Sequence, residues 1–457
     1  MKNIASRTWF ALALACLLLF GLLTFLVRYV LFADRWVSWS GSPHLYTASG
    51  ALDTGRVCDR GGKLLYDSAG SRSYADDALT RRATLHLLGD REGNIPNLIV
   101  RQYAQDLVGY SKLDGTASME RGGGELRLTV SASVQGVALQ ALSGRKGTVG
   151  VYNYRTGEIL CAVTSPTFDP DDVPDIAGDT TGKYDGAYVY RFFNTTYTPG
   201  SIFKLVTSAA ALEQLSGITE RRFTCEGSVT VNGERITCPK AHGELTFKEA
   251  LARSCNCTFA QIVGELGAKT LQKAADRAGI EDSLSVDGLH TAPGCFDLSD
   301  ANENDVAWAG IGQYTDLVNP CQYMTFLGAI ASGGSAAKPY LVAQAKCGTE
   351  ITYTASTEQT GKLLDADAAA RLQEMMRYNV EKIYGKSSFP DLKVCAKSGT
   401  AEVGQDANTA TFAGFVLDER YPLAFVVVVE GGGSGSETCA PIAGTVLRAC
   451  VNVMDGE

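Results

Sequence analysis

"NTTYTPGSIFKLVTSAAALEQL", residues 194–215, decides the fold, because it marks the start of a long helix in the middle of the chain. Pro199 and Gly200 end an extended segment, and an apolar run with helical spacing follows Ser201. A serine at this place is a favoured helix N-cap. It also precedes Lys204 by three residues, so both side chains share one face of the expected helix. The stretch therefore fits either a helix cap or a serine nucleophile with a lysine base.

The spacing S-x-x-K is weak by itself, since it occurs three times, at Ser143–Lys146, Ser201–Lys204 and Ser335–Lys338. The first pair lies between glycines and leads into a strand, and Pro339 blocks a helix after the third. The middle pair alone opens a long helix in this interpretation, which makes it the candidate for catalysis.

Two further motifs follow in order. "SCN" contains Ser254 and Asn256, and "KSGT" begins at Lys397, just before two apolar segments. Each has an ordinary explanation: a helix-start serine with a capped turn, and an edge-strand lysine beside a turn. Their order and position after the S-x-x-K helix favour the catalytic interpretation of all three.

The strand pattern indicates an α+β domain. "GTVGVYNYRTGEILCAVTSP", residues 147–166, predicts two strands around a turn at Thr156-Gly157. "TFAGFVLDERYPLAFVVVVEGGG", residues 411–433, predicts two buried strands, and "APIAGTVLRACVNVM", residues 440–454, has helical spacing. Strands open and close the domain while helices fill the middle, so we expect the first and last strands to share one antiparallel sheet.

The N-terminus is expected to anchor the chain in a membrane. No charged residue lies between Thr8 and Val27, a run of about the 20 residues that a helix needs to cross a bilayer. Lys2 and Arg7 precede it, which places the N-terminus in the cytoplasm and the rest outside. A cleaved signal peptide is the alternative. The expected division is a tail at 1–7, an anchor at 8–31, an N-terminal module at 32–140 and a large domain at 141–457.

The module is expected to be a small, mostly β pedestal or interaction domain. "GRVCDRGGKLLYDSAG", residues 55–70, predicts a hairpin that turns at Gly61-Gly62. "ELRLTVSASVQGVALQAL", residues 125–142, predicts a strand that leads into a helix.

Composition excludes several classes of partner. The formal net charge is -9 and no basic block stands out, so no nucleic-acid partner is expected. With 4 His and neither an HExxH motif nor paired CxxC motifs, we expect no metal and no cofactor.

The 13 cysteines leave one pairing open. Cys225 and Cys238 bracket "EGSVTVNGERIT", in which Asn232-Gly233 predicts a hairpin turn, so the two form a disulfide or remain buried thiols. Cys255 and Cys257 flank Asn256, but two thiolates are too few for a metal, so packing is expected. His242 is expected to be structural.

The three motifs, in this order, resemble those of the penicillin-binding transpeptidases and serine β-lactamases. The resemblance extends over nearly the whole chain after the anchor and is to the class B, monofunctional penicillin-binding proteins. It includes "CPKAHGELTFKEALARSCN" (238–256), "GIGQYTDLVNPCQYMTFLGAIASGG" (310–334), "TGEILCAVTSPTFDPDD" (156–172) and "GRVCDRGGKLLYDS" (55–68). The chain departs from the family's usual residues at Thr54, Gly61, Asn319 and Ser398, none of which removes a catalytic group.

The resemblance implies a transpeptidase/β-lactamase-like fold for residues 141–457 and acyl transfer at a D-alanyl-D-alanine bond. Ser201 would be the nucleophile and Lys204 its base. Ser254 would relay a proton, and Asn256 would hold Lys204 and the substrate in place. Lys397 would carry a positive charge that keeps Lys204 neutral. Ser398, Gly399 and Thr400 would bind substrate, and the backbone N–H groups of Ser201 and Thr400 would form the oxyanion hole.

The implied partners are peptidoglycan stem peptides, β-lactams as covalent inhibitors, and a glycosyltransferase in a wall-synthesis complex. A D,D-carboxypeptidase and a β-lactamase or β-lactam sensor share the motifs and remain alternatives. An inactive scaffold is a third, which the complete motif set disfavours.

Overall fold

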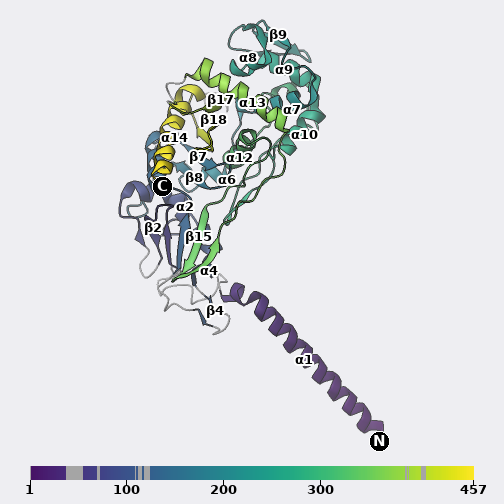
Figure 1. The fold of residues 1–457 in the computed structure, drawn as a ribbon, viewed down its shortest axis with the longest axis vertical. Helices are drawn as coiled ribbons and strands as arrows, with labels where there is room; N and C mark the ends of the chain where they lie inside the picture. Colours follow the sequence, from purple (N-terminus) through teal and green to yellow (C-terminus); the bar gives the residue numbers. More distant parts are fainter. Residues whose placement is uncertain are drawn as a thin grey trace.

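The computed structural model describes residues 2–37, 55–68, 73–108, 110–111, 116–117, 124–385, 389, 391–402 and 408–456. Residues 38–54, which belong to the expected module and include Thr54, lie outside the described residues. A long N-terminal helix extends away from a body made of a small β module and a large α+β domain (Figure 1).

The strands are β1 (Gly55–Cys58), β2 (Leu64–Asp67), β3 (Ser73–Tyr74), β4 (Tyr110–Ser111), β5 (Thr116–Ala117), β6 (Gly124–Leu128), β7 (Gly147–Asn153), β8 (Ile159–Ser165), β9 (Arg222–Cys225), β10 (Ser228–Val231), β11 (Glu234–Thr237), β12 (Gly243–Thr246), β13 (Ser285–Val286), β14 (Leu289–His290), β15 (Val342–Cys347), β16 (Glu350–Thr354), β17 (Val394–Glu402), β18 (Asn408–Val416) and β19 (Leu423–Val429).

The α-helices are α1 (Lys2–Val37), α2 (Ala78–Leu88), α3 (Leu98–Gln102), α4 (Ala104–Val108), α5 (Ala132–Leu142), α6 (Arg191–Asn194), α7 (Lys204–Gln214), α8 (Phe247–Ala252), α9 (Asn256–Leu266), α10 (Ala268–Arg277), α11 (Glu303–Ala309), α12 (Pro320–Ala331), α13 (Ala366–Asn379) and α14 (Ala440–Asp455). Three shorter turns are η3 (Gly200–Ile202), η4 (Val380–Tyr384) and η6 (Gly435–Cys439).

The large domain is built on one antiparallel sheet in the order β17-β18-β19-β7-β8. Its first strands, β7 and β8, therefore lie beside its last strand, β19, which confirms the expected α+β arrangement. Both predicted hairpins and the C-terminal helix α14 are present. Every residue of β7, β8 and β19 is buried, because both faces of the sheet are covered.

The two faces of this sheet pack against different helices. Alternate residues of β19, such as Phe425 and Val427, pack with α5 and α14 in one core. The residues between them, such as Val426, face a second core that contains α7 and α12. Figure 1 shows α14 along one side of the sheet and α12 on the other. This second core contains the helix that follows Ser201.

The strands β1, β2, β3 and β6 of the N-terminal module belong to a six-stranded sheet in the order β16-β15-β6-β1-β2-β3. The predicted β1–β2 hairpin and the predicted strand and helix β6–α5 are both present. Strands β15 and β16 come from residues 342–354, beyond the module, and β15 pairs antiparallel with β6. The division at residue 140 stays a prediction, but this sheet takes strands from both sides of it.

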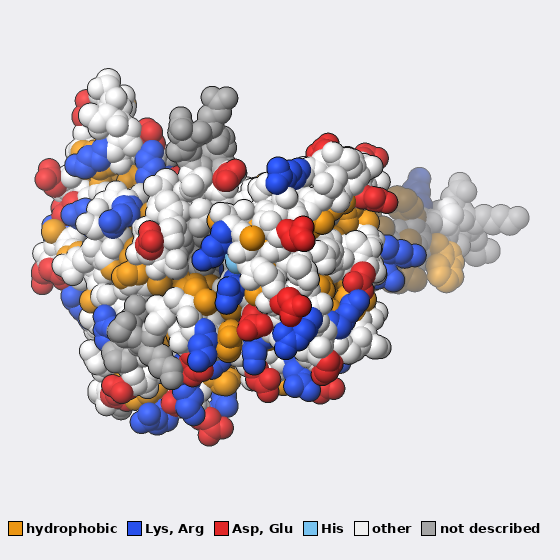
Figure 2. All heavy atoms as spheres, turned by 90° about the horizontal axis from the view of Figure 1, so that it is seen from above, with side chains coloured by type: hydrophobic (Ala, Val, Ile, Leu, Met, Phe, Trp, Pro, Cys, Tyr) orange, Lys and Arg blue, Asp and Glu red, His pale blue; other side chains and the backbone are white. Residues whose placement is uncertain are grey.

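Helix α1 contains a stretch, Ser6–Phe32, that is long and apolar enough to cross a membrane by length and composition. Its side chains there are not buried against the rest of the chain. Seen from above, the body carries interspersed acidic and basic side chains, with apolar side chains gathered in a band across the middle of this face (Figure 2).

Candidate active site

Ser201 lies in a tight turn that comes just before the helix. Residues 200–202 form the 3₁₀ turn η3, and α7 begins at Lys204 with Phe203 at its N-cap position and no capping side chain. The expectation that Ser201 caps the helix is therefore wrong. Gly200 has a φ of 54°, which turns the chain sharply, and the N–H of Phe203 already bonds the carbonyl of Gly200 at 2.9 Å. The Ser201 hydroxyl instead faces Lys204.

Residues from the 310–334 region hold this turn in place. The N–H of Gly200 donates to the carbonyl of Gly312 at 2.9 Å, and the hydroxyl of Tyr323 donates to the carbonyl of Ile202 at 2.7 Å. A Cβ on Gly312 would lie 2.1 Å from the carbonyl oxygen of Gly200, so only glycine permits this approach. The "GIGQ" segment, which belongs to the stretch that resembles the family, thus makes a contact that positions Ser201.

Lys204 is the centre of the site and is fully buried. Its Nζ lies 3.1 Å from Ser201 Oγ, 2.9 Å from the Ser254 carbonyl oxygen, 3.2 Å from Ser254 Oγ and 2.7 Å from Asn256 Oδ1. The first two predicted motifs therefore meet at one amine.

The "SCN" motif is held in an unusual backbone conformation. Ser254 has a φ of 55°, and Cys255, rather than Ser254, occupies the N-cap of α9. Asn256 donates from Nδ2 to the carbonyl of Thr237 at 2.8 Å, which fixes its amide so that Oδ1 faces Lys204. The strand β11 that ends at Thr237 is thus part of the support of the site.

Lys397 joins the third motif to the other two. Its side chain is fully buried, with Nζ 3.1 Å from Ser254 Oγ, and it donates to the carbonyl of Ser398 at 2.7 Å. Ser254 Oγ consequently lies within hydrogen-bond distance of two lysine amines.

Burial shifts both amines toward the neutral form. It lowers the pKa of Lys204 to about 7, against a smaller opposing effect of Cys255 and other neighbouring cysteines. Burial, and then the charge of Lys204, lower the pKa of Lys397 well below its usual value. Burial is the main cause of the Lys204 shift, and the expectation that Lys397 acts as the cation that keeps Lys204 neutral stays a prediction.

The "KSGT" residues lie on β17, an edge strand of the sheet. The N–H of Ser398 donates to the hydroxyl of Tyr384 at 2.9 Å, and the Ser398 and Tyr384 hydroxyls lie 3.0 Å apart. N–H groups of alternate residues point to the same side of a strand, so the N–H of Thr400 also faces the free edge. No pattern in the sequence indicates Tyr384, since it comes from the separate turn η4.

This edge lies directly against the turn that contains Ser201. A Cβ on Gly399 would lie 2.7 Å from the carbonyl oxygen of Pro199, and one on Gly200 would lie 2.8 Å from that of Thr400. Ser398 is half-buried and Thr400 is exposed. The Ser398 hydroxyl lies beside that of Tyr384, and the Thr400 hydroxyl accepts from the N–H of Gly435 at 3.4 Å.

Comparison with known proteins agrees with this geometry. Residues 147–448 match the family described as the penicillin-binding protein transpeptidase domain. The chain belongs to this family. Peptidoglycan D,D-transpeptidase PbpA of Mycobacterium tuberculosis is 27% identical to this penicillin-binding protein over 379 residues, 76% of each chain. PbpA is a class B member, as the sequence resemblance predicted.

Solved structures give the same fold for this penicillin-binding protein. The D,D-transpeptidase domain of a peptidoglycan glycosyltransferase from Eggerthella lenta has a TM-score of 0.75 at 24% identity and covers 88% of this chain and 98% of its own. The penicillin G acyl-enzyme complex of penicillin-binding protein A from M. tuberculosis has a TM-score of 0.73 at 23% identity, with 87% and 99% covered.

The other two S-x-x-K pairs lie elsewhere in this penicillin-binding protein. Ser143 closes α5 as its C-cap, and Lys146 pairs with Asp185 at 3.0 Å. Lys338 pairs with Glu358 at 3.2 Å, in a segment outside any helix.

The disulfide alternative for Cys225 and Cys238 is not realised. No disulfide joins any of the thirteen cysteines, all of which lie in the described part of the chain. The Cys225 sulfur lies 3.5 Å from His242 Nδ1, and the Cys238 sulfur lies 3.8 Å from that of Cys255. The hairpin between them, β10–β11, is present as predicted, with positive φ at Asn232 and Gly233.

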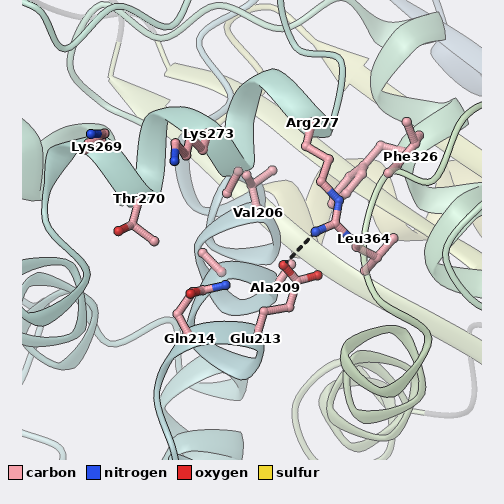
Figure 3. A pocket seen from close by; sticks show the side chains of 13 residues that line it. Val206, Ala209, Glu213, Gln214, Lys269, Thr270, Lys273, Arg277, Phe326 and Leu364 are labelled. Atoms are coloured by element: carbon pink, nitrogen blue, oxygen red, sulfur yellow. Dashed lines mark hydrogen bonds and ion pairs between the residues drawn. The ribbon is translucent and has the colours of Figure 1, made fainter.

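A pocket of about 350 Å³ opens between α7, α10 and residues 363–364 (Figure 3). It is lined by residues of α7 such as Val206 and Ala209, which helical spacing places on the face opposite Lys204. Arg277 and Glu213 form an ion pair of 3.0 Å across it. None of the described motif residues lines this pocket, so it is distinct from the candidate site.

Proposed function

We propose that this penicillin-binding protein is a peptidoglycan D,D-transpeptidase that forms an acyl-enzyme on Ser201. The observation that carries the proposal is the chain of contacts Ser201–Lys204–Ser254–Lys397, in which a hydroxyl faces a buried amine and a second hydroxyl lies between two amines. The names of relatives, such as the D,D-transpeptidase PbpA, support the same reaction.

In the first step, Ser201 Oγ attacks the carbonyl carbon of the penultimate D-alanine. Lys204 is neutral for a large fraction of the time near pH 7, because burial lowers its pKa to about 7, so its lone pair can accept the Ser201 proton. The C–N bond to the last D-alanine then breaks. The Ser254 hydroxyl gives its proton to the leaving nitrogen and regains one from Lys204, 3.2 Å away.

In the second step the roles reverse. An amine of a neighbouring stem peptide attacks the Ser201 ester, and its proton passes through Ser254 and Lys204 to the departing Ser201 oxygen. Asn256 keeps Lys204 aimed between the two hydroxyls. The net result is a new peptide bond in place of the D-Ala-D-Ala bond, with no proton gained or lost.

The edge of β17 is proposed to bind the substrate. The N–H groups of Ser201 and Thr400 would stabilise the oxyanion, and the close contact between η3 and β17 supports their convergence. The hydroxyls of Ser398 and Thr400 would bind the substrate carboxylate, with Gly399 allowing the close approach of the strand. Lys397 would hold the Ser254 hydroxyl and, when protonated, attract the carboxylate of the bound substrate.

The chain is further proposed to be a single-pass membrane protein with the N-terminus in the cytoplasm and residues 32–457 outside. The apolar helix α1 supports an anchor, and Lys2 and Arg7 support the orientation. β-Lactams would acylate Ser201, just as penicillin G forms an acyl-enzyme with penicillin-binding protein A of M. tuberculosis. A glycosyltransferase partner in a wall-synthesis complex belongs to the same proposal.

The test is product analysis with a peptide that ends in D-Ala-D-Ala, with and without an acceptor amine. A transpeptidase releases D-alanine and forms the amide with the acceptor. Hydrolysis that the acceptor does not change would indicate a D,D-carboxypeptidase, and rapid turnover of penicillin would indicate a β-lactamase. Ser208→Ala is a matched control, because the buried hydroxyl of Ser208 on α7 has no hydrogen-bond partner among the residues that the structure describes.

A further inference from the structure

We propose that this penicillin-binding protein holds one zinc ion in a site made of Cys225, Cys238, His242 and Cys255, immediately beside the "SCN" motif. The four possible ligand atoms, three sulfurs and one imidazole nitrogen, all lie within 4.8 Å of one another. Thiolate and imidazole are the ligands that structural zinc prefers, and four of them complete its coordination.

The spacing of these atoms fits a tetrahedral ion. With Zn–S distances of about 2.3 Å and a Zn–N distance of about 2.0–2.1 Å, tetrahedral zinc separates two sulfurs by about 3.8 Å and a sulfur from a nitrogen by about 3.6 Å. The sulfurs of Cys238 and Cys255 are 3.8 Å apart, and the Cys225 sulfur lies 3.5 Å from His242 Nδ1. Two opposite edges of the tetrahedron are thus already present.

Two of the three sulfurs accept hydrogen bonds from groups around the cluster. Cys225 and Cys255 are buried. Thr258 donates to the Cys255 sulfur from its backbone N–H at 3.5 Å and from its hydroxyl at 3.2 Å, and the N–H of Cys257 donates to the Cys238 sulfur at 3.4 Å. Such outer donors orient metal-bound thiolates. On binding, each of the three thiols would release its proton to water.

Cys257 is a fourth thiol at the border of the cluster, 3.5 Å from the Cys238 sulfur, but it does not belong to the four ligand atoms that all lie within 4.8 Å of one another. Its position offers a competing outcome, a disulfide with Cys238. A metal site with the four ligands does not need Cys257, whereas the disulfide does, so replacement of Cys257 distinguishes the two outcomes.

The ion would connect the chain segments whose positions determine the geometry of the catalytic motif. Cys225 ends β9, Cys238 follows β11, and Cys255 caps α9. The residues next to these ligands, Thr237 and Asn256, share the 2.8 Å hydrogen bond that aims Asn256 at Lys204. The metal would therefore stabilise the backbone on both sides of that bond.

The sequence pattern does not group these residues, because their spacing matches no known zinc motif. Cys255 and Cys257 alone are too few ligands, and nothing in the sequence links His242 to them. The hairpin β10–β11 brings Cys225, Cys238 and His242 to the start of α9.

The experiment measures zinc in the full chain, purified in detergent without oxygen, by mass spectrometry of the metal. We expect close to one zinc per chain. Replacement by cobalt should give visible d–d bands and thiolate charge-transfer absorption of a tetrahedral site. Cys225→Ser and Cys238→Ser should lose most of the metal, whereas Cys257→Ser should keep it. Cys295→Ser, outside the cluster, is the matched control.

Three results would overturn the proposal. One is a chain with reduced thiols that takes up neither zinc nor cobalt. The second is equal metal loss in Cys295→Ser and Cys225→Ser, which would indicate adventitious binding. The third is a Cys238–Cys257 disulfide in chain purified without oxygen, which would show that oxidants in the cell had already joined the two thiols.

The effect on catalysis rests on the proposed function and is tested separately. Removal of the metal by a chelator should slow acylation by fluorescent penicillin, and zinc should restore the rate. An unchanged rate would contradict the positioning role while leaving the metal content standing. No labelling of any form would contradict the proposed function instead.

Discussion

Ser254 has the least ordinary position of the motif residues. Its φ is positive at 55°, and its hydroxyl lies between two buried amines at 3.2 and 3.1 Å. A non-glycine residue in this conformation carries strain that the surrounding structure must offset. This backbone conformation places the hydroxyl between the two lysine amines, where it can exchange protons with both.

The pH dependence of acylation tests the role of Lys204. Burial lowers its pKa to about 7, and the base must be deprotonated, so the acylation rate by penicillin should be low below pH 6, rise through about pH 7 and level off above it. Stopped-flow labelling across pH 5.5–9 measures this. Lys204→Ala should slow acylation about 10²–10⁴-fold. A flat profile would contradict Lys204 as the base.

Tyr384→Phe tests a residue that the sequence did not indicate. The substitution removes the hydroxyl that holds both the N–H and the hydroxyl of Ser398. We expect weaker binding of substrates with a terminal carboxylate, seen as a raised KM with kcat little changed. Ser398→Ala should give a similar loss, and the double variant should lose little more. Additive losses would contradict a shared role.

At the scale of elements, two glycines in different surroundings should respond in opposite ways to alanine. Gly312 has a φ of 91° and a Cβ there would lie 2.1 Å from the Gly200 carbonyl oxygen, so Gly312→Ala should displace η3, slow acylation and lower stability by about 1–3 kcal/mol. Gly264 lies exposed inside α9 with open space around it, so Gly264→Ala should raise stability by about 0.5–1 kcal/mol. Thermal unfolding and penicillin labelling report both. A harmless Gly312→Ala would contradict the contact.

Local patterns predicted most elements but not how distant ones combine. The hairpins β7–β8 and β18–β19 follow from alternation and turn residues within one segment. The 3₁₀ turn at Ser201 depends instead on Gly312, over 100 residues away, and a cap and a tight turn share the same local sequence. The pairing of β15 with β6 and the grouping of Cys225 with Cys255 likewise depend on contacts between segments far apart in the chain.

At the scale of the whole molecule, the module and the large domain are joined by more than one connection. Strand β15 pairs with β6, and Arg81 of α2 holds Asp169 through two hydrogen bonds of 2.7 Å. Both links join residues before 140 to residues beyond it. The module therefore supports the large domain through a shared sheet as well as through the chain.

Two truncations test this architecture. A chain that begins at residue 55, without α1, should be soluble without detergent and keep its penicillin labelling, because the apolar stretch Ser6–Phe32 is not buried against the body. A chain that begins at residue 141 loses β6 and leaves β15 with an unpaired edge, so it should aggregate. Size-exclusion chromatography distinguishes them. A monomeric, active chain from residue 141 would contradict the structural role of the module.

The central claim is a covalent acyl group on Ser201. The most direct measurement is the mass of the intact chain after brief exposure to penicillin, followed by mapping of the modified peptide, for the unaltered chain, Ser201→Ala and Ser208→Ala. We predict one added penicillin that persists for minutes, located on the peptide that contains Ser201, in the unaltered chain and in Ser208→Ala, and none in Ser201→Ala. An adduct on another residue, or an adduct that survives in Ser201→Ala, would contradict the account.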